Sequence, residues 1–158
     1  MILLILASLL RKSRGRMDNL KNDALVNADS LTVAKAAVYV LIEKKALDVK
    51  LYNVSEDSSI TDFYVNVTGR SSTNVASLAD EVTYKLGLSG RDPLRVEGRS
   101  GNSWILVDYG DVIVNIFDRE SRDFYNFDRL LPEASLTDIS DVISEVDKKY
   151  DINNKKED

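Results

Sequence analysis

The chain has 158 residues and a net charge of −5, with 44% hydrophobic and 30% charged residues, as is typical of one soluble domain with its own core. It contains neither cysteine nor histidine. That composition excludes disulfides, zinc sites built on thiolate or imidazole, cysteine nucleophiles and Ser-His-Asp catalysis. Any metal would be a hard cation held by oxygen ligands. The acidic charge argues against direct, sequence-specific nucleic-acid binding, although an acidic chain can dock onto a basic protein.

Residues 1–28 are expected to form an N-terminal extension. Residues 1–10 are apolar, and four cations follow between residues 11 and 16 without an acid. Ten apolar residues cannot cross a bilayer, which needs about 20, and a secretory signal carries its charges before the apolar run. The favoured interpretation is a start assigned too far upstream, with Met17 as the working start and residues 1–16 foreign to the native chain. An Arg-rich organellar presequence is the alternative.

The first half of the domain predicts alternating helices and strands. Asp29 or Ser30 can cap a helix, because apolar residues recur at helical spacing directly after them. β-branched and aromatic residues then predict two strands, and a glycine-serine turn opens a second amphipathic helix. The predicted ranges are helix 31–46, strands 47–54 and 60–68, and helix 73–86.

The second half predicts more strands and then helices. Residues 104–117 predict a hairpin, since two alternating apolar runs flank the turn Tyr109-Gly110-Asp111. The other predicted ranges are strand 94–97, helix 119–125, helix 137–150 and a disordered polar tail from residue 151. The expected fold is α/β, a mixed β-sheet with helices on one or both faces. Its domain spans residues 29–132, followed by an acidic extension, residues 133–158, that is partly helical or disordered.

The hairpin carries the residues with the most chemistry. An exposed aromatic pair, Trp104 and Tyr109, is expected at the strand end and the turn, and strand alternation places Asp108 on the face of Trp104. Three interpretations of Asp108 and Asp111 stay open: they accept turn amide protons, they face a basic partner, or they bind a metal. Trp104, the only tryptophan, fits either core packing or an interface, where its truncation often costs ~2 kcal/mol or more.

An enzymatic interpretation rests on the turn Gly69-Arg70-Ser71-Ser72, because a glycine-serine turn into a helix can bind phosphate. Together with Asp108 and Asp111 as ligands, it would make the chain a magnesium-dependent nucleotidyltransferase. Nucleotidyltransferases commonly carry Asp-x-Asp on one strand face, whereas the acids here are spaced Asp-x-x-Asp around a turn. That spacing argues against an enzyme.

Several segments, in order and spacing, resemble the ribosomal silencing factor S (Iojap) family. They are ITDFY at 60–64 with Thr68-Gly69, VASLAD at 75–80, RVEG at 95–98, the hairpin 104–117, and residues 122–130, so that the resemblance covers about residues 31–132. The chain departs from the family at Asn115, where a histidine is frequent, and at Leu131, where a tryptophan is usual.

The resemblance implies a non-enzymatic factor without cofactor or metal, on a fold like that of the nucleotidyltransferases. Such factors bind the large ribosomal subunit through its ribosomal protein fourteen, block subunit joining and repress translation when nutrients are scarce. They are usually homodimers when free, and a bacterial cytoplasmic location is expected. The partner-binding residues it suggests are anchors and orienting acids, namely Trp104, Tyr109, Glu97, Asp108 and Asp111. Tyr125 and Phe127 are interpreted as packing residues.

Overall fold

The computed structural model describes residues 22–155, so the predictions for residues 1–21, including Met17 as the start, lie outside it. The helices are α2 (Ser30–Glu43), α3 (Ser72–Leu88), α4 (Arg119–Tyr125) and α5 (Ser140–Asn154), with the 3-10 helices η1 (Phe127–Leu130) and η2 (Glu133–Ser135). The strands are β1 (Leu47–Asn53), β2 (Phe63–Thr68), β3 (Arg95–Glu97), β4 (Trp104–Asp108), β5 (Val112–Phe117) and β6 (Leu136–Thr137). The predicted elements are confirmed with small boundary shifts, whereas η1, η2 and β6 were not predicted.

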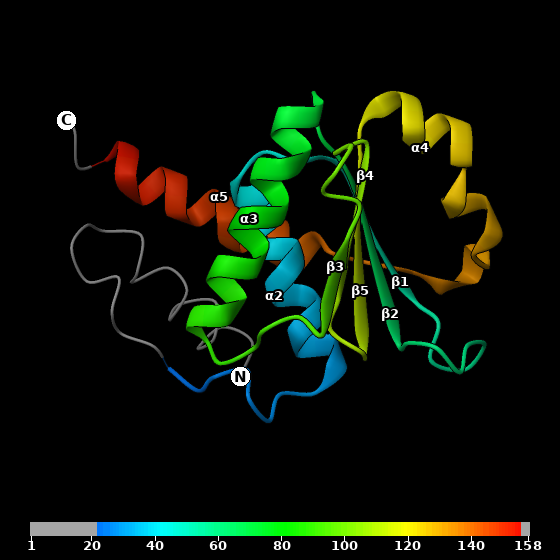
Figure 1. The fold of residues 1–158 in the computed structure, drawn as a ribbon. Coiled ribbons are helices and arrows are strands. Elements are labelled where there is room, and N and C mark those ends of the chain that lie inside the picture. The colour runs from blue at the N-terminus through cyan, green and yellow to red at the C-terminus, as the bar shows by residue number, and fades with distance from the viewer. Residues whose placement is uncertain (1–21, 156–158) are drawn as a thin grey trace.

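The strands form one mixed sheet in the order β3-β4-β5-β2-β1-β6. β2 and β5 are parallel neighbours, and all other adjacent strands in this sheet are antiparallel. Figure 1 shows α2 and α3 on one face of the sheet and α4 on the other. The predicted α/β class, with a mixed sheet flanked by helices, is therefore confirmed.

Three side-chain caps fix where the helices begin. Asp29 accepts the amide proton of Thr32 at 2.8 Å. Hydrogen bonds from the side chain and the backbone of Thr32 hold the pKa of Asp29 below its usual range. Ser71 caps α3 and Asp118 caps α4 in the same way. Because α3 and α4 follow the parallel strands β2 and β5, both helices start at the same edge of the sheet but leave toward opposite faces.

The hydrophobic core lies between the sheet and the layer of α2 and α3. Alternate strand residues point into it, including Val65, Val67, Ile105, Val114 and Ile116. α2 contacts the sheet, α3 and α5, and its middle is therefore buried on nearly every side. The opposite side of each strand forms what we call the outer face, which carries Tyr64, Asn66, Thr68, Arg95, Glu97, Trp104, Leu106, Asp108, Ile113, Asn115 and Phe117.

The segments on both sides of the expected domain, residues 29–132, pack onto it. Leu25 is fully buried in the core, and its amide donates to the carbonyl of Ser89. β6 pairs with β1, and α5 packs on α2 through buried Val142 and Val146. α5 continues to Asn154, so the expectation of disorder from residue 151 is wrong up to that residue. Within residues 22–155 no helix is long and apolar enough to span a membrane.

Candidate functional site

The predicted hairpin is present and presents its polar side chains on the outer face. Trp104 pairs with Phe117, and Asp108 pairs with Ile113, on either side of a tight turn. Gly110 has φ +89°, a backbone conformation that side chains disfavour, and its amide donates to Oδ1 of Asp108 at 2.7 Å. The interpretation that Asp108 stabilises the turn is therefore confirmed.

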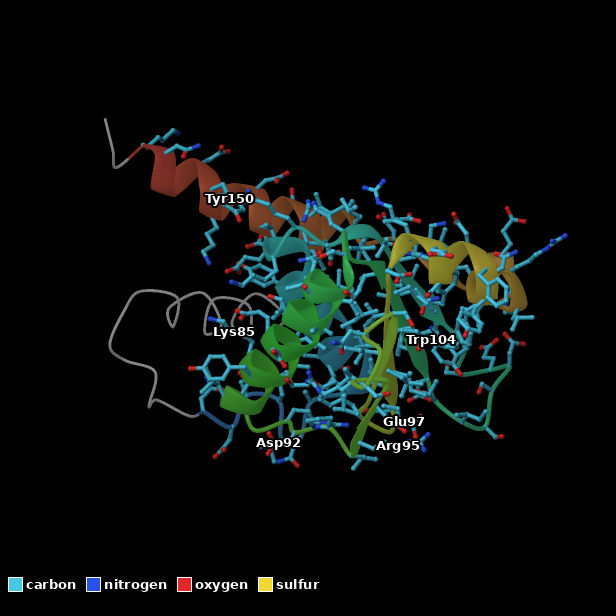
Figure 2. All side chains as sticks on the ribbon, turned by 45° about the horizontal axis from the view of Figure 1, so that its top comes forward. Lys85, Asp92, Arg95, Glu97, Trp104 and Tyr150 are labelled. Atoms are coloured by element: carbon cyan, nitrogen blue, oxygen red, sulfur yellow. The ribbon has the colours of Figure 1, made fainter. Side chains whose placement is uncertain are left out.

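Trp104 is half-buried between the sheet and the segment formed by α4 and η1. Its ring centroid lies 4.8 Å from that of Phe117, 4.9 Å from Tyr125 and 6.1 Å from Phe127. Its indole Nε1 donates to Oδ1 of Asn115 at 3.0 Å. The packing interpretation of Trp104 is thus met in part, because its ring contacts its neighbours while the residue stays partly exposed, on the side of the sheet that carries α4 (Figure 2). Its role at an interface stays a prediction.

A chain of buried amides continues from Trp104 across the sheet. Nδ2 of Asn115 donates to Oδ1 of Asn66 at 3.1 Å, and Nδ2 of Asn66 donates to Oδ1 of Asp128 at 3.1 Å. Both asparagines are fully buried. The chain therefore joins β4, β5, β2 and η1 in one line of hydrogen bonds, as polar groups at such depth require.

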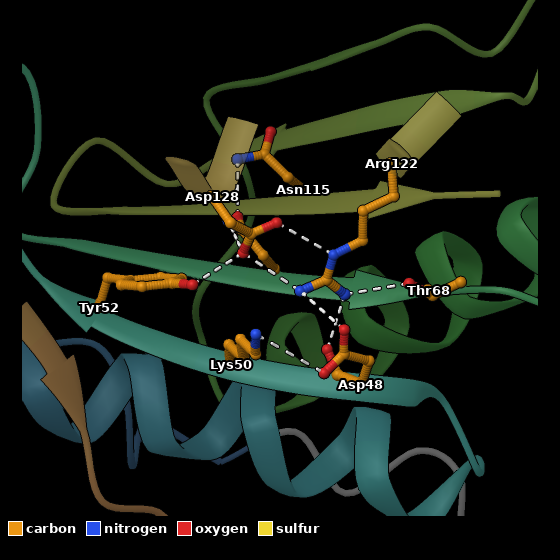
Figure 3. A network of polar contacts seen from close by, with 8 residues as sticks. Asp48, Lys50, Tyr52, Thr68, Asn115, Arg122 and Asp128 are labelled. Atoms are coloured by element: carbon orange, nitrogen blue, oxygen red, sulfur yellow. Dashed lines mark hydrogen bonds and ion pairs between the residues drawn. The ribbon is translucent and has the colours of Figure 1, made fainter. Parts of the chain in front are cut away.

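The chain ends at a clamp formed by Arg122 and Asp128 (Figure 3). Arg122 is only 7% exposed, and its Nε and Nη2 donate to the two oxygens of Asp128 at 3.1 Å each. Its Nη1 donates to the carbonyl of Asp48 at 2.6 Å and to Oγ1 of Thr68 at 3.0 Å. Tyr52 also donates to Asp128, at 2.9 Å. A cleft of about 530 Å³ opens beside the clamp.

Asp128 is a carboxylate held ionised by its donors. Burial by itself raises its pKa, but the hydrogen bonds and charge of Arg122, with the hydrogen bonds of Asn66 and Tyr52, outweigh that effect and leave the pKa below its usual range. For Tyr52, burial and the hydrogen bond to Asp128 raise the pKa of the phenol. The clamp therefore pairs a neutral tyrosine and a charged arginine with one carboxylate.

The acids of the outer face are paired within the chain. Arg95 donates from Nε to Asp108 and from Nη1 to Glu97, each at 3.0 Å, so two carboxylates share one cation. Asp111 instead contacts Arg91 at 2.6 Å. Asp108 and Asp111 thus form ion pairs with different arginines. Within residues 22–155, no group of three or more acids could hold a metal ion.

Two predicted features of the site are corrected by the structure. Tyr109 was expected to be exposed, but its side chain is 2% exposed, with its hydroxyl buried and its pKa raised by burial. It points into the packed interior because Tyr109 lies on the opposite side of the strand from Asp108. Ser71, a candidate for phosphate binding, uses its hydroxyl to cap α3 by accepting the amide proton of Asn74 at 3.1 Å.

Three large apolar side chains that the sequence did not single out as a surface lie exposed on α4 and η1, the segment that packs on Trp104. Phe124 and Tyr125 on α4 are 78% and 52% exposed, and their rings contact edge to face at 5.1 Å. Leu130 on η1 is 78% exposed. The signal was present in the sequence, since a helix of seven residues cannot bury two adjacent aromatics on one face. The predicted packing of Phe127 is confirmed by its ring contacts with Trp104 and Tyr64, whereas Tyr125 contacts Trp104 and is still 52% exposed.

The family described as ribosomal silencing factor during starvation matches residues 27–158. This chain belongs to that family. Among relatives of the ribosomal silencing factor family, the protein from Halalkalibacterium halodurans named ribosomal silencing factor RsfS is 33% identical over 108 residues, which are 68% of this chain and 92% of the relative. The Arabidopsis thaliana protein named Iojap-related, mitochondrial, is 32% identical over 110 residues, 63% of this chain and 60% of that protein.

A solved structure of a Chromobacterium violaceum protein is similar in fold and sequence. It has a TM-score of 0.64 and 31% identity, and the match covers 66% of this chain and 87% of that one. The ribosomal silencing factor family is regulatory and non-enzymatic, so the comparisons confirm the expectation that this chain is not an enzyme. The nucleotidyltransferase alternative is therefore wrong.

Proposed function

We propose that the chain binds the large ribosomal subunit through its ribosomal protein fourteen and sterically blocks joining with the small subunit. Translation would then be repressed under nutrient limitation, as the family description, ribosomal silencing factor during starvation, suggests. The mechanism needs occupancy alone, because a domain seated on the intersubunit surface obstructs the other subunit without breaking a bond.

The observation that carries this proposal is the exposed aromatic group on α4 beside Trp104. We call Trp104, Phe124, Tyr125 and Leu130, together with Glu97 and Asp108, the docking face. Aromatic side chains dominate the binding energy of many interfaces, and exposed apolar groups of this size commonly mark binding sites. The exposed ring of Tyr125 packs on the partly buried ring of Trp104 and is therefore less mobile, which lowers the side-chain entropy lost on binding.

Charge supports a basic partner for this face. Glu97 and Asp108 share the single cation of Arg95, which leaves one excess negative charge beside the aromatic group. Such a charge favours encounter with a basic ribosomal protein and fixes the orientation of docking. Asp111 stays a predicted contact, although its carboxylate already faces Arg91.

Three finer statements remain predictions that accompany this proposal. The free chain is expected to be a homodimer, which light scattering of the purified protein measures. A bacterial cytoplasmic location is expected, in keeping with the bacterial relatives named ribosomal silencing factor. The likeness of the fold to the nucleotidyltransferases is expected from the resemblance and would be measured by superposition on such enzymes.

Co-sedimentation with isolated large subunits tests the proposal. Phe124→Ala is expected to weaken binding roughly tenfold or more, since truncation of a central aromatic often costs ~2 kcal/mol. Tyr84→Ala is the matched control, because Tyr84 is an exposed aromatic (46% against 78% for Phe124) on α3, in the helical layer on the opposite face of the sheet. Crosslinking to ribosomal protein fourteen identifies the partner. Equal binding by both variants, or no binding by the parent chain, would overturn the proposal.

A further inference from the structure

We propose that Asp128 and Arg122 are positioning residues for the docking face. They hold α4 and η1 on the sheet, and the chain through Asn66 and Asn115 carries their effect to Trp104. This inference rests on the proposed function, because it concerns what keeps the same surface in a binding shape. None of the four residues needs to touch the partner.

The first step concerns how α4 and η1 are attached. Arg122 is the only buried residue of α4, and η1 has no buried residue. The apolar side chains Phe124 and Leu130 point to solvent and cannot hold the segment. Arg122 instead joins α4 to β1 and β2 through Asp48 and Thr68, and it joins α4 to η1 through Asp128. The segment that carries the exposed aromatics is thus anchored by this charged clamp together with the ring contacts of Tyr125 and Phe127 on the sheet.

The second step concerns the direction of the hydrogen-bond chain. An ionised carboxylate only accepts hydrogen bonds, and an indole N–H only donates. Asp128 therefore makes Asn66 donate with its nitrogen, which turns the oxygen of Asn66 toward Asn115. Asn115 must then donate in turn, and its oxygen is left to accept from Trp104. The carboxylate of Asp128 therefore determines the orientation of both amides. As a result, the oxygen of Asn115, and not its nitrogen, faces Trp104.

The third step follows from the depth of the chain. Both amides are fully buried, so an amide that loses its partner has no water to replace it. Removing an acceptor, either an oxygen of Asp128 or Oδ1 of Asn115, leaves a donor of the chain unpaired and favours a different orientation of Trp104. The clamp and the ring are therefore coupled although they lie at opposite ends of the chain.

The experiment uses Trp104 as its own reporter, because it is the only tryptophan of the chain. Emission and acrylamide quenching are measured on the full-length protein with Asp128→Asn and with Asn115→Leu. Both variants are expected to shift the emission and increase quenching, as the ring loses its fixed environment. Asp123→Asn is the matched control, since Asp123 is an exposed acid on α4, the helix of Arg122, and lines the same cleft as Asp128.

Binding to isolated large subunits is the second readout. Asp128→Asn is expected to weaken co-sedimentation about tenfold, and Asp123→Asn to leave it unchanged. In a Trp104→Phe background, which lacks the indole N–H, Asn115→Leu is expected to cause no further loss. That pattern separates an effect through Trp104 from a general loss of structure or a direct contact.

The outcomes are distinct. If Asp128→Asn and Asn115→Leu leave both emission and quenching of the folded protein unchanged, the positioning role is overturned. Should Asn115→Leu fail to fold by circular dichroism, Asp128→Asn decides alone by the same readouts. If the parent chain does not bind large subunits, the proposed function fails, while the fluorescence of the unbound protein still decides the positioning.

Discussion

Oδ1 of Asn115 accepts a hydrogen bond of 3.0 Å from the indole Nε1 of Trp104, across the two strands of the hairpin. The same amide donates to Asn66 from its nitrogen at 3.1 Å. One side chain thus supplies an acceptor on one side and a donor on the other. Whatever occupies position 115 must offer both to keep the tryptophan in place.

Asn115→His is expected to make the state of Trp104 depend on pH. A neutral imidazole has one acceptor and one donor nitrogen and can replace the amide, whereas an imidazolium has two donors and cannot accept from the indole. Tryptophan emission of this variant should match the parent at pH 8 and change as pH falls below ~6.5, with burial moving the midpoint lower. The parent chain has no histidine and serves as control. A flat profile for the variant would contradict the expectation.

Asp128→Asn is expected to remove a part of the stability that depends on pH. The folded pKa of Asp128 is lowered, so its carboxylate contributes fully above the unfolded pKa of about 3.9 and loses this contribution as pH falls through the folded value. At pH 7 the variant should lose about 2 kcal/mol of unfolding free energy, because Arg122 keeps a buried charge with a weakened partner. Urea unfolding of both proteins at pH 7 and pH 3 measures this, and the difference should shrink at pH 3.

Gly98→Ala is expected to destabilise the connection between β3 and β4. Gly98 has φ +93°, and a Cβ at this position would overlap the carbonyl oxygen of Trp104. Backbone strain and the clash together should cost ~2 kcal/mol or more. Gly101→Ala is the matched control, since a Cβ there meets no atom within 4 Å and Gly101 has no positive φ. Equal melting temperatures of the two variants would contradict the prediction.

Tyr109→Phe is expected to leave binding unchanged and to keep or raise stability by up to about 1 kcal/mol. The hydroxyl of Tyr109 is buried and has no hydrogen-bond partner among residues 22–155, so its removal relieves a desolvation cost. Thermal unfolding and co-sedimentation with large subunits measure the two effects. Loss of binding in a stable variant would restore Tyr109 as a docking residue.

Local signals predicted most of the secondary structure. Asp29 was predicted as a cap of α2, and the glycine-serine turn predicted the start of α3, because a cap acts on the amides of its own first turn. The hairpin around Gly110 was predicted correctly, because the alternation of apolar residues and the choice of turn residues are properties of neighbouring residues. β6 has only two residues, and it exists because it meets β1 in space, so no local pattern marked it.

Local patterns predicted less of the candidate functional site. Trp104 and Asp108 were placed on one face correctly, since side-chain alternation decides that. Tyr109 was expected to be exposed because it was assigned to the turn, whereas its side chain continues the alternation of Ile105 and Val107 into the core. Arg122 and Asp128 were not predicted as site residues, because in the sequence both resemble ordinary charged residues of a solvated helix.

The sequence by itself determined the α/β class, the exclusion of metal sites built on thiolate or imidazole, and the family resemblance, because these depend on residue types, order and local spacing. Only the tertiary structure decided that Arg122 is buried, that two asparagines from parallel strands meet, and that their amides end at Trp104. Those contacts join residues up to 74 positions apart, as between Arg122 and Asp48. Burial and the direction of a hydrogen bond depend on partners brought together by the fold, and no local pattern encodes them.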